Sequence, residues 1–298
     1  MKRFVFIICI CTSVLYADEF TLATYNVQNL FDAIHDGTEY GEFLPSEIWT
    51  ESLCDKNIAS IASVIKRLDA DILLLQEVEN ISVLERMRDT FLADMGYDYI
   101  FCPKGKSATN VGVLSRIPLS YVRVHAFYRE DFPYLRPVVE FSFSHGSEKF
   151  FVFAVHLKSK LGGEEKTAPA REFQLRLVAG RVRELMLKAD ANIIVAGDFN
   201  EREDKVEAFL DSLSGYDFLS GWELFSVDDG SYFYNGRWEK IDSFFISGTL
   251  FDGNGYDAIS MTRITSGLLI DGKPLKRDYH SGEGFSDHLP LVLRISCD

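Results

Sequence analysis

Six short polar motifs, each at the end of an apolar run, are the feature that most constrains this chain. They bring carboxylates, carboxamides and two histidines to the ends of strands that are scattered along the sequence. The six motifs are Tyr25-Asn26-Val27-Gln28-Asn29, Leu75-Gln76-Glu77-Val78-Glu79, Val155-His156-Leu157-Lys158, Gly197-Asp198-Phe199-Asn200, Lys240-Ile241-Asp242 and Ser286-Asp287-His288. These side chains suit a hard divalent cation and a phosphoryl group, and they do not suit a thiol, dinucleotide or soft-metal site.

Apolar runs of strand length alternate with helical patterns along the chain. We expect strands over 20–27, 71–78, 97–101, 111–115, 120–127, 138–144, 150–157, 192–196, 241–247 and 289–295. The segments 72–75 and 193–195 are apolar at consecutive positions, as in strands that are buried on both faces. The dipeptides Asn235-Gly236 and Asp271-Gly272 predict two hairpins.

Helical spacing of apolar residues predicts helices over 57–68 and 170–188, with Pro169 in the first turn of the second helix. A short helix is expected after Asn200. Mixed strands and helices without a break in composition predict one α/β domain, in which two sheets pack face to face with helices outside. The segment 252–257 is interpreted as a turn rather than a calcium loop, because Tyr256 takes a ligand position and the closing Glu is missing.

The N-terminus has the pattern of a cleavable signal peptide over residues 1–17. Lys2 and Arg3 precede an apolar run over 4–15, and Ala17 stands at a cleavage point. The run is too short to span a membrane, and a buried first strand is the alternative. We therefore expect a mature domain over 18–298, located in the periplasm or secreted.

Composition limits the partners of the mature chain. Cleavage after Ala17 leaves 29 basic and 45 acidic residues, a net charge of −16, which argues against nonspecific coating of nucleic acid or of an anionic membrane. We expect no stable membrane association and a monomer. Cys54, Cys102 and Cys297 remain, which allows at most one intrachain disulfide.

Two pairs of polar side chains are candidates for cation and phosphate chemistry. The carboxylate of Glu77 and the carboxamide of Asn26 match part of a Mg²⁺ shell, although polar residues also end strands at ordinary turns. Asp198 and Asn200, two apart in an extended segment, point the same way beyond a buried strand. For this second pair, a helix N-cap is an equal alternative.

Two histidines complete the set of candidate residues. His288 can act as an acid or a base near neutral pH, and Asp242 can orient it through its other ring nitrogen. His156 ends another strand, and it can stabilise the charge that develops on a phosphorane. The remaining histidines are interpreted as structural side chains: His35, His125, His145 and His280.

In this order and at this spacing, the six motifs resemble the endonuclease/exonuclease/phosphatase superfamily, related to pancreatic deoxyribonuclease I and exonuclease III. The resemblance spans about residues 20–296. It implies a four-layer α/β sandwich with the site on one edge of two stacked sheets. It also implies Mg²⁺ or Mn²⁺ as cofactor and cleavage of a phosphoester by water. Because no Gly-x-Ser-x-Gly elbow is present, direct attack by water is favoured over a covalent intermediate.

The resemblance also implies a role for each candidate residue. Glu77 corresponds to the principal metal ligand, with Asn26 and Asp287 at or near the metal. His288 corresponds to the base or proton relay, oriented by Asp242. Further implied roles are positioning of nucleophile and phosphate by Asp198 and Asn200, stabilisation of the transition state by His156, and phosphate contacts or surface salt bridges for Arg136 and Arg171. Whether Asp198 or His288 takes the proton first stays open.

Three loops, over 32–52, 104–110 and 266–285, are candidates for setting the choice of substrate. The second contains Lys104 and Lys106 and the third contains Lys273, Lys276 and Arg277; together with Lys158, Lys160 and Lys166 they could form a positive rim. Aromatic residues around the first hairpin, among them Tyr232 and Tyr234, could stack on bases. The leading hypothesis is a secreted or periplasmic endonuclease acting on DNA, RNA or both. The alternatives are a phosphatase or sphingomyelinase-like phospholipase C of the same superfamily and, from a different class, a non-catalytic binding module.

Overall fold

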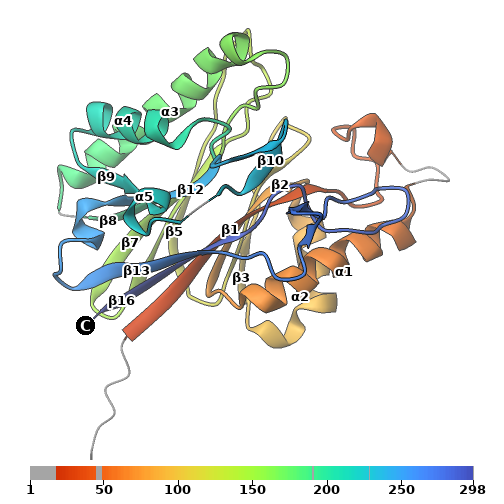
Figure 1. The fold of residues 1–298 in the computed structure, drawn as a ribbon, viewed down its shortest axis with the longest axis horizontal. Coiled ribbons are helices and arrows are strands. Elements are labelled where there is room, and N and C mark those ends of the chain that lie inside the picture. The colour runs from red at the N-terminus through yellow and green to blue at the C-terminus, as the bar shows by residue number, and fades with distance from the viewer. Residues whose placement is uncertain (1–17, 45–48, 190, 228, 298) are drawn as a thin grey trace, which may run out of the picture.

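Two six-stranded sheets packed face to face form the centre of the molecule, with helices on both outer faces (Figure 1). The computed structural model describes residues 18–44, 49–189, 191–227 and 229–297. The expected signal peptide over 1–17 lies outside these residues. Within them, no helix has both the length and the apolar character needed to cross a membrane.

The first sheet has the strand order β13-β16-β1-β2-β4-β3. Its strands are β13 (Tyr256–Arg263), β16 (Leu291–Cys297), β1 (Asp18–Leu30), β2 (Ile72–Val78), β4 (Asn110–Ser115) and β3 (Tyr99–Phe101). Only one pair in this sheet, β1 with β2, is parallel among the described strands. The polar ends of β1 and β2 therefore lie at the same edge.

The second sheet has the strand order β5-β6-β7-β8-β12-β9. Its strands are β5 (Leu119–His125), β6 (Val138–His145), β7 (Glu148–His156), β8 (Asn192–Asp198), β12 (Asp242–Ser247) and β9 (Phe218–Ser220). Here β7 and β8 are parallel, and β12 runs antiparallel to β8, so that β12 begins where β8 ends. Two small hairpins are β10 (Tyr232–Tyr234) with β11 (Arg237–Glu239), and β14 (Leu269–Ile270) with β15 (Lys273–Pro274).

Three apolar clusters separate the four layers. One lies between the sheets and includes Phe20, Phe141 and Ile194. A second cluster joins the first sheet to α1 (Glu51–Leu68) and α2 (Ile81–Phe91). A third joins the second sheet to α3 (Glu164–Met186) and α4 (Glu203–Ser214), and a short α5 (Gly221–Leu224) follows β9. Strands buried on both faces explain the consecutive apolar runs, and the predicted four-layer sandwich is confirmed.

Several element boundaries differ from the sequence predictions. The helix expected over 170–188 begins at Glu164, so Pro169 stands inside α3 rather than in its first turn. The helix expected from residue 57 begins at Glu51, where the Thr50 side chain accepts a hydrogen bond from the Leu53 N–H. Neither α2 nor β13 was expected. Polar residues such as Asp257 alternate within β13, and an edge strand of this kind has no apolar run to reveal it.

Both predicted Asn-Gly and Asp-Gly turns are confirmed. Asn235 and Gly236 have φ of 48° and 80°, and Asp271 and Gly272 have φ of 51° and 72°. Positive φ at both central residues matches the twist of the flanking strands. The first hairpin matters for the site, because Tyr232 at its start forms a β-bridge with His288.

Candidate active site

All six polar motifs meet at one edge of the two sheets. Parallel β1 and β2 end there, and so do parallel β7 and β8, while β12 begins opposite the end of β8 with Asp242 paired to Asp198. A cleft of about 1060 Å³ opens over this edge. Its lining includes Glu77, His156, Asp198, Asn200, Asp287 and His288. Residues separated by more than 250 positions in sequence therefore face one cavity.

Glu77 enters the cleft because both neighbouring strand pairs shift register around it. The β1–β2 pairing shifts between Asn26 and Leu30, and the β2–β4 pairing shifts between Gln76 and Val78. Glu77 has φ of 65°, in the left-handed region that bulges allow. Its carboxylate accepts hydrogen bonds from Asn26 Nδ2 at 3.2 Å and from the Asn29 N–H at 2.8 Å. The bulge thus turns this carboxylate from the sheet into the cleft.

Left-handed backbone is concentrated at this edge. Nine non-glycine residues among the described ranges have positive φ, and four of them lie in the site motifs: Gln28, Asn29, Glu77 and Asn200. Such conformations cost free energy and persist where the surrounding structure enforces them, which is common at functional sites.

The Asn26 amide joins the two sheets at the base of the cleft. Its Nδ2 donates to Glu77 Oε1 at 3.2 Å and to Asp198 Oδ2 at 3.0 Å, while its Oδ1 accepts from the Gln28 N–H at 3.0 Å. Asn26 therefore presents an amide nitrogen to the two carboxylates, whereas the sequence expectation gave it a metal-facing oxygen. In this structure, Asn26 positions Glu77 and Asp198.

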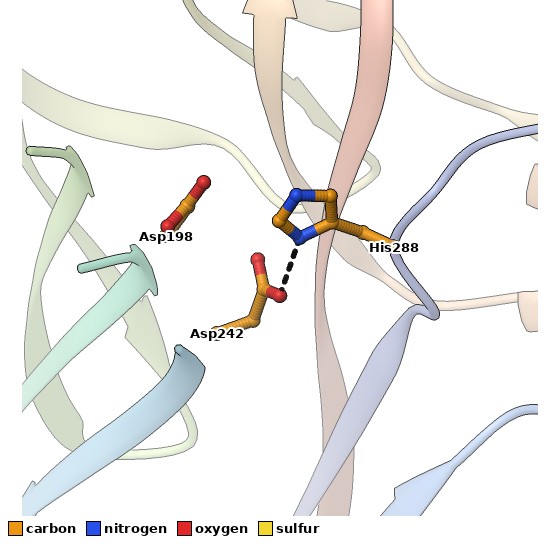
Figure 2. A group of neighbouring side chains, drawn as sticks. All are labelled: Asp198, Asp242 and His288. Atoms are coloured by element: carbon orange, nitrogen blue, oxygen red, sulfur yellow. Dashed lines mark hydrogen bonds and ion pairs between the residues drawn. The ribbon is translucent and has the colours of Figure 1, made fainter. Parts of the chain in front are cut away.

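Asp242 and His288 form a buried pair beside Asp198 (Figure 2). His288 Nδ1 lies 2.7 Å from Asp242 Oδ2, which also accepts a hydrogen bond from Ser231 Oγ at 2.6 Å. The Tyr232 ring stacks on the His288 ring with centroids 4.6 Å apart. The imidazole is held on one nitrogen and one face, so Nε2 is the nitrogen left for chemistry.

His156 lies between the two sheets at the bottom of the cleft. Its Nε2 is 3.5 Å from Asp198 Oδ2 and 3.9 Å from Glu77 Oε1, and the residue is 2% exposed. Asn200 follows Asp198, and its side chain donates to the Leu157 carbonyl at 3.3 Å. Its backbone N–H donates to Asp198 Oδ1 at 2.9 Å. The two residues expected to project beyond β8 therefore brace each other.

Burial and neighbouring charges set different protonation states for three of these groups. Burial and the Asp242 charge raise the pKa of Asp198 to about 7. Burial alone would lower the pKa of His288, but attraction to Asp242 raises it to about 10. Burial, together with the cationic groups of Arg136 and His288, holds the pKa of His156 well below its usual range. Near neutral pH, His288 is protonated, His156 is neutral and Asp198 titrates.

Basic and aromatic side chains surround the cleft. They are Arg136, Lys158, Lys160, Lys276, Tyr232, Tyr234 and Tyr279. A second pocket of about 810 Å³ shares Tyr40, Arg136 and Lys158 with the cleft, and it extends the lined surface to Lys106 and to Tyr134, which is 68% exposed.

Two arginines singled out from the sequence lie away from the cleft lining. Arg171 is 1% exposed and forms an ion pair with Glu201 at 3.2 Å, so its salt-bridge alternative holds in a buried form. Arg277 is 2% exposed, and its guanidinium contacts main-chain carbonyls, including that of Gly282 at 3.3 Å. The packing of the loop that follows β15 buries Arg277, which therefore adds no charge to the rim.

Sequence reasoning missed two residues that shape the site. Ser231 donates to Asp242, and Tyr279 Oη donates to the Gln28 carbonyl at 2.7 Å, which fixes the bulge of β1. A single serine in a loop gives no sequence pattern. Tyr279 stands in the loop 266–285, which was selected for its lysines and not for its tyrosine.

A four-layer sandwich with carboxylates and histidines at one edge of both sheets is the architecture of deoxyribonuclease I-like proteins. The chain belongs to the Endonuclease/Exonuclease/phosphatase family, whose model matches residues 21–296. No curated protein matches the chain by sequence.

Solved structures share the fold at low sequence identity. Truncated Caenorhabditis elegans TDP2 is 19% identical with a TM-score of 0.64, covering 94% of this chain and 98% of its own. ANGEL2, a 2',3'-cyclic phosphatase, is 14% identical with a TM-score of 0.64, and coverage is 94% and 95%. An endonuclease/exonuclease/phosphatase from Bacteroides vulgatus is also 14% identical with a TM-score of 0.64, and coverage is 94% and 99%.

Proposed function

We propose that this protein is a Mg²⁺-dependent phosphodiesterase that cleaves DNA, RNA or both as an endonuclease. The observation that carries the proposal is the convergence of Glu77, Asp198, His156 and the Asp242–His288 pair on one cleft. The family match supports phosphoester hydrolysis as the class of reaction. We further propose, from residues 1–17, that the protein acts in the periplasm or outside the cell.

The donor set fits a hard divalent cation. Glu77 offers a carboxylate whose side chain is 20% exposed to the cleft, and Asp287 lines the same cleft. Carboxylate oxygens beside open, water-accessible space suit Mg²⁺, which keeps several waters and takes one or two carboxylates. Glu77 and Asp287 would hold the ion, with Mn²⁺ as an alternative occupant. When bound, the ion would supply charge neutralisation at the phosphate and a lowered pKa for water.

The chain's own residues would bind the phosphate and move the proton. Asp198 and the Asp242–His288 pair lie together, so they can accept the proton that the attacking water loses and return one to the leaving oxygen. Asn26 and Asn200 fix the Asp198 carboxylate for this role. Neutral His156 can donate a hydrogen bond from Nε2 to a phosphoryl oxygen.

The surroundings of the cleft support a polymeric substrate. Lys158 and Lys160 line the cleft itself, and the adjoining pocket adds Lys106 and the exposed ring of Tyr134. Successive cationic and aromatic side chains match the phosphates and bases of a nucleic acid strand better than they match a single phosphate group. A Danio rerio TDP2 structure, with 18% identity and a TM-score of 0.61, holds a single-strand DNA product, which agrees with this choice.

The direct test incubates purified protein from Asp18 with supercoiled plasmid, linear DNA and RNA, in Mg²⁺ or in EDTA. We expect Mg²⁺-dependent nicking of the plasmid, and a loss of about 10³-fold or more in Glu77→Ala because several kcal/mol of charge stabilisation are removed. Glu85→Ala, an exposed carboxylate on α2, is the matched control. Turnover of 2',3'-cyclic phosphates, inositol phosphates or sphingomyelin without cleavage of nucleic acid would instead identify a phosphatase or phospholipase.

A further inference from the structure

We propose that Asp36, Glu39 and Glu79, with Asp32 beside them, form a Ca²⁺ site outside the catalytic cleft. The proposal is independent of the proposed nuclease function. It joins two chain segments, since three of these residues lie on the loop after β1 and Glu79 follows the end of β2.

The carboxylates meet because the two strand ends are joined. The Glu79 N–H donates to the Leu30 carbonyl at 3.0 Å, and the Asp32 N–H donates to Glu79 Oε2 at 2.7 Å. One carboxylate oxygen each from Asp36, Glu39 and Glu79 then lies within 4.8 Å of the others. This spacing allows one ion to contact all three.

The protein compensates the negative charge of this group only in part. The Glu39 side chain is 1% exposed, and Glu79 is 3% exposed. Across the described ranges, no lysine or arginine forms an ion pair with any of the four carboxylates. A histidine also contacts the group: His35 Nδ1 lies 2.9 Å from Glu39 Oε2. The Asp32, Glu39 and Glu79 side chains are all largely buried. Backbone N–H groups of Asp36 and Gly37 donate to the Glu39 carboxylate, and burial raises the pKa of Glu79 to about 8, so a cation bound here would displace a proton from Glu79.

An unpartnered oxygen points to the missing ligand. Glu79 Oε1 is buried and has no hydrogen-bond partner among the described residues, although its Oε2 is paired with the Asp32 N–H. Leaving a buried acceptor unpaired costs free energy, so native structures rarely do so without a ligand or water. A cation bound between Glu79, Asp36 and Glu39 would satisfy this oxygen.

The ligand set favours Ca²⁺ over Mg²⁺. Ca²⁺ takes six to eight oxygens in flexible geometry, whereas Mg²⁺ usually takes one or two carboxylates and keeps its waters. Asp36 and Glu39 lie in a tight loop in which Gly37, with φ of 98°, allows the chain to turn back on itself. Such a loop can add backbone carbonyls to the carboxylates.

Binding there would affect the catalytic cleft through the same loop. Tyr40, Gly41 and Glu42 follow Glu39 directly and line the cleft. Glu79 stands two residues beyond Glu77, next to the bulge that turns Glu77 inward. We therefore expect Ca²⁺ to stabilise the loop and the end of β2 without taking part in the chemistry.

The test uses Tb³⁺, a Ca²⁺ analogue whose luminescence is sensitised by a nearby indole. Trp49 is close enough, because its Nε1 donates to the Asp32 carbonyl at 2.6 Å. All measurements use Glu77→Ala protein, so that the proposed catalytic ion does not contribute. We expect Tb³⁺ emission that Ca²⁺ displaces, with affinity at least tenfold weaker once Glu39→Gln and Glu79→Gln are added. Asp94→Asn, an exposed carboxylate outside the cluster, should change nothing.

Equilibrium dialysis with Ca²⁺ decides the matter even if the double variant does not fold. One Ca²⁺ bound per Glu77→Ala chain, with a melting temperature that rises with Ca²⁺, supports the site. The proposal is overturned if Glu77→Ala binds no Ca²⁺, or if binding persists unchanged in a folded Glu39→Gln single variant.

Discussion

The chain buries two clusters of charged side chains, and they differ in how completely their polar atoms are paired. In the first, Glu140 on β6 is fully buried between His125, at 2.6 Å, and Arg181 of α3, at 2.9 Å. Arg181 donates to both carboxylate oxygens, and His125 contacts one of them. In the second, at the catalytic edge, Asp242 Oδ1 and His156 Nδ1 have no partner within the described part of the chain.

The contrast separates stabilising charges from charges that are available for chemistry. Glu140 is paired with the Arg181 guanidinium and the His125 ring and has no open side, so nothing remains for a ligand. The catalytic edge places Asp198, Asp242 and Glu77 together with incomplete compensation, which a cation and a phosphate could complete. A buried histidine therefore serves structure in one cluster and, in our proposal, catalysis in the other.

The largest effect should come from replacing one buried histidine in each cluster by alanine. We expect His288→Ala to reduce turnover by about 10⁴-fold, or about 5 kcal/mol, because a positioned proton donor and acceptor is lost. His125→Ala should keep turnover per folded molecule and lose stability instead. Steady-state kinetics measure turnover, and urea unfolding measures stability. Equal activity losses in the two variants would contradict the distinction between a structural and a catalytic histidine.

A second prediction concerns the centre of the paired cluster. Glu140→Gln should lower the free energy of unfolding by about 3–5 kcal/mol, because the Arg181 guanidinium loses its buried countercharge. Glu184→Gln removes the other, exposed partner of Arg181 and should cost at most about 1 kcal/mol. Chemical denaturation compares the two variants. A small change in Glu140→Gln would show that the pair contributes little.

A third prediction concerns how the stabilisation by Glu140 depends on pH. Burial alone would raise the pKa of Glu140, but hydrogen bonds from His125 and Arg181 lower it below its ordinary value of 4.5. The unfolded chain thus binds this proton more readily than the native one. The stabilisation is complete above the unfolded pKa and is lost as pH falls through the folded pKa. The free energies of unfolding of wild type and Glu140→Gln should therefore converge as the pH falls. A difference that stays constant with pH would contradict the assignment.

The smallest effect is expected at the pocket that adjoins the cleft. Lys106→Ala should weaken nucleic-acid binding less than tenfold in low salt, and it should reduce the slope of log affinity against log salt by about 0.7–0.9, the loss of one phosphate contact. Fluorescence anisotropy without added metal measures the slope. Lys188→Ala, at an exposed position two residues beyond the end of α3, provides the control. Identical slopes for both variants would remove this pocket from the proposed binding surface.

Much of the fold followed from local pattern. Strands such as β2 and β8 are apolar on both faces, so their central position could be predicted, and the Asn235-Gly236 hairpin was fixed by the φ values that its turn requires. The helix α2 and the edge strand β13 were not found this way. Within β13 only Tyr256 and Met261 are buried, so strand periodicity is weak there. By contrast, α2 buries Val83, Leu84 and Met87 at helical spacing, a short pattern that the sequence prediction overlooked.

For the site, the sequence indicated the residue types, but it could not give their orientation. Asp242 was expected to orient His288, and the 2.7 Å contact agrees with that geometry, while the catalytic roles remain proposals. Asn26 was expected to offer an oxygen to the metal, yet its amide nitrogen faces Glu77 and Asp198. Arg171 and Arg277 were interpreted from the sequence as surface cations, but both are buried. Their burial could not be predicted, because it depends on segments far away in the sequence.

The sequence by itself determined the alternation of buried strands and helices, the polar motifs at strand ends and the two tight turns. These depend on neighbours within a few residues, through side-chain period and allowed φ. Tertiary structure alone decided that β1 and β2 bulge around Glu77, that Ser231 supports Asp242, and that Glu79 approaches Asp36 and Glu39. Each of these needs contacts between distant segments, which form only when both sheets close on one edge.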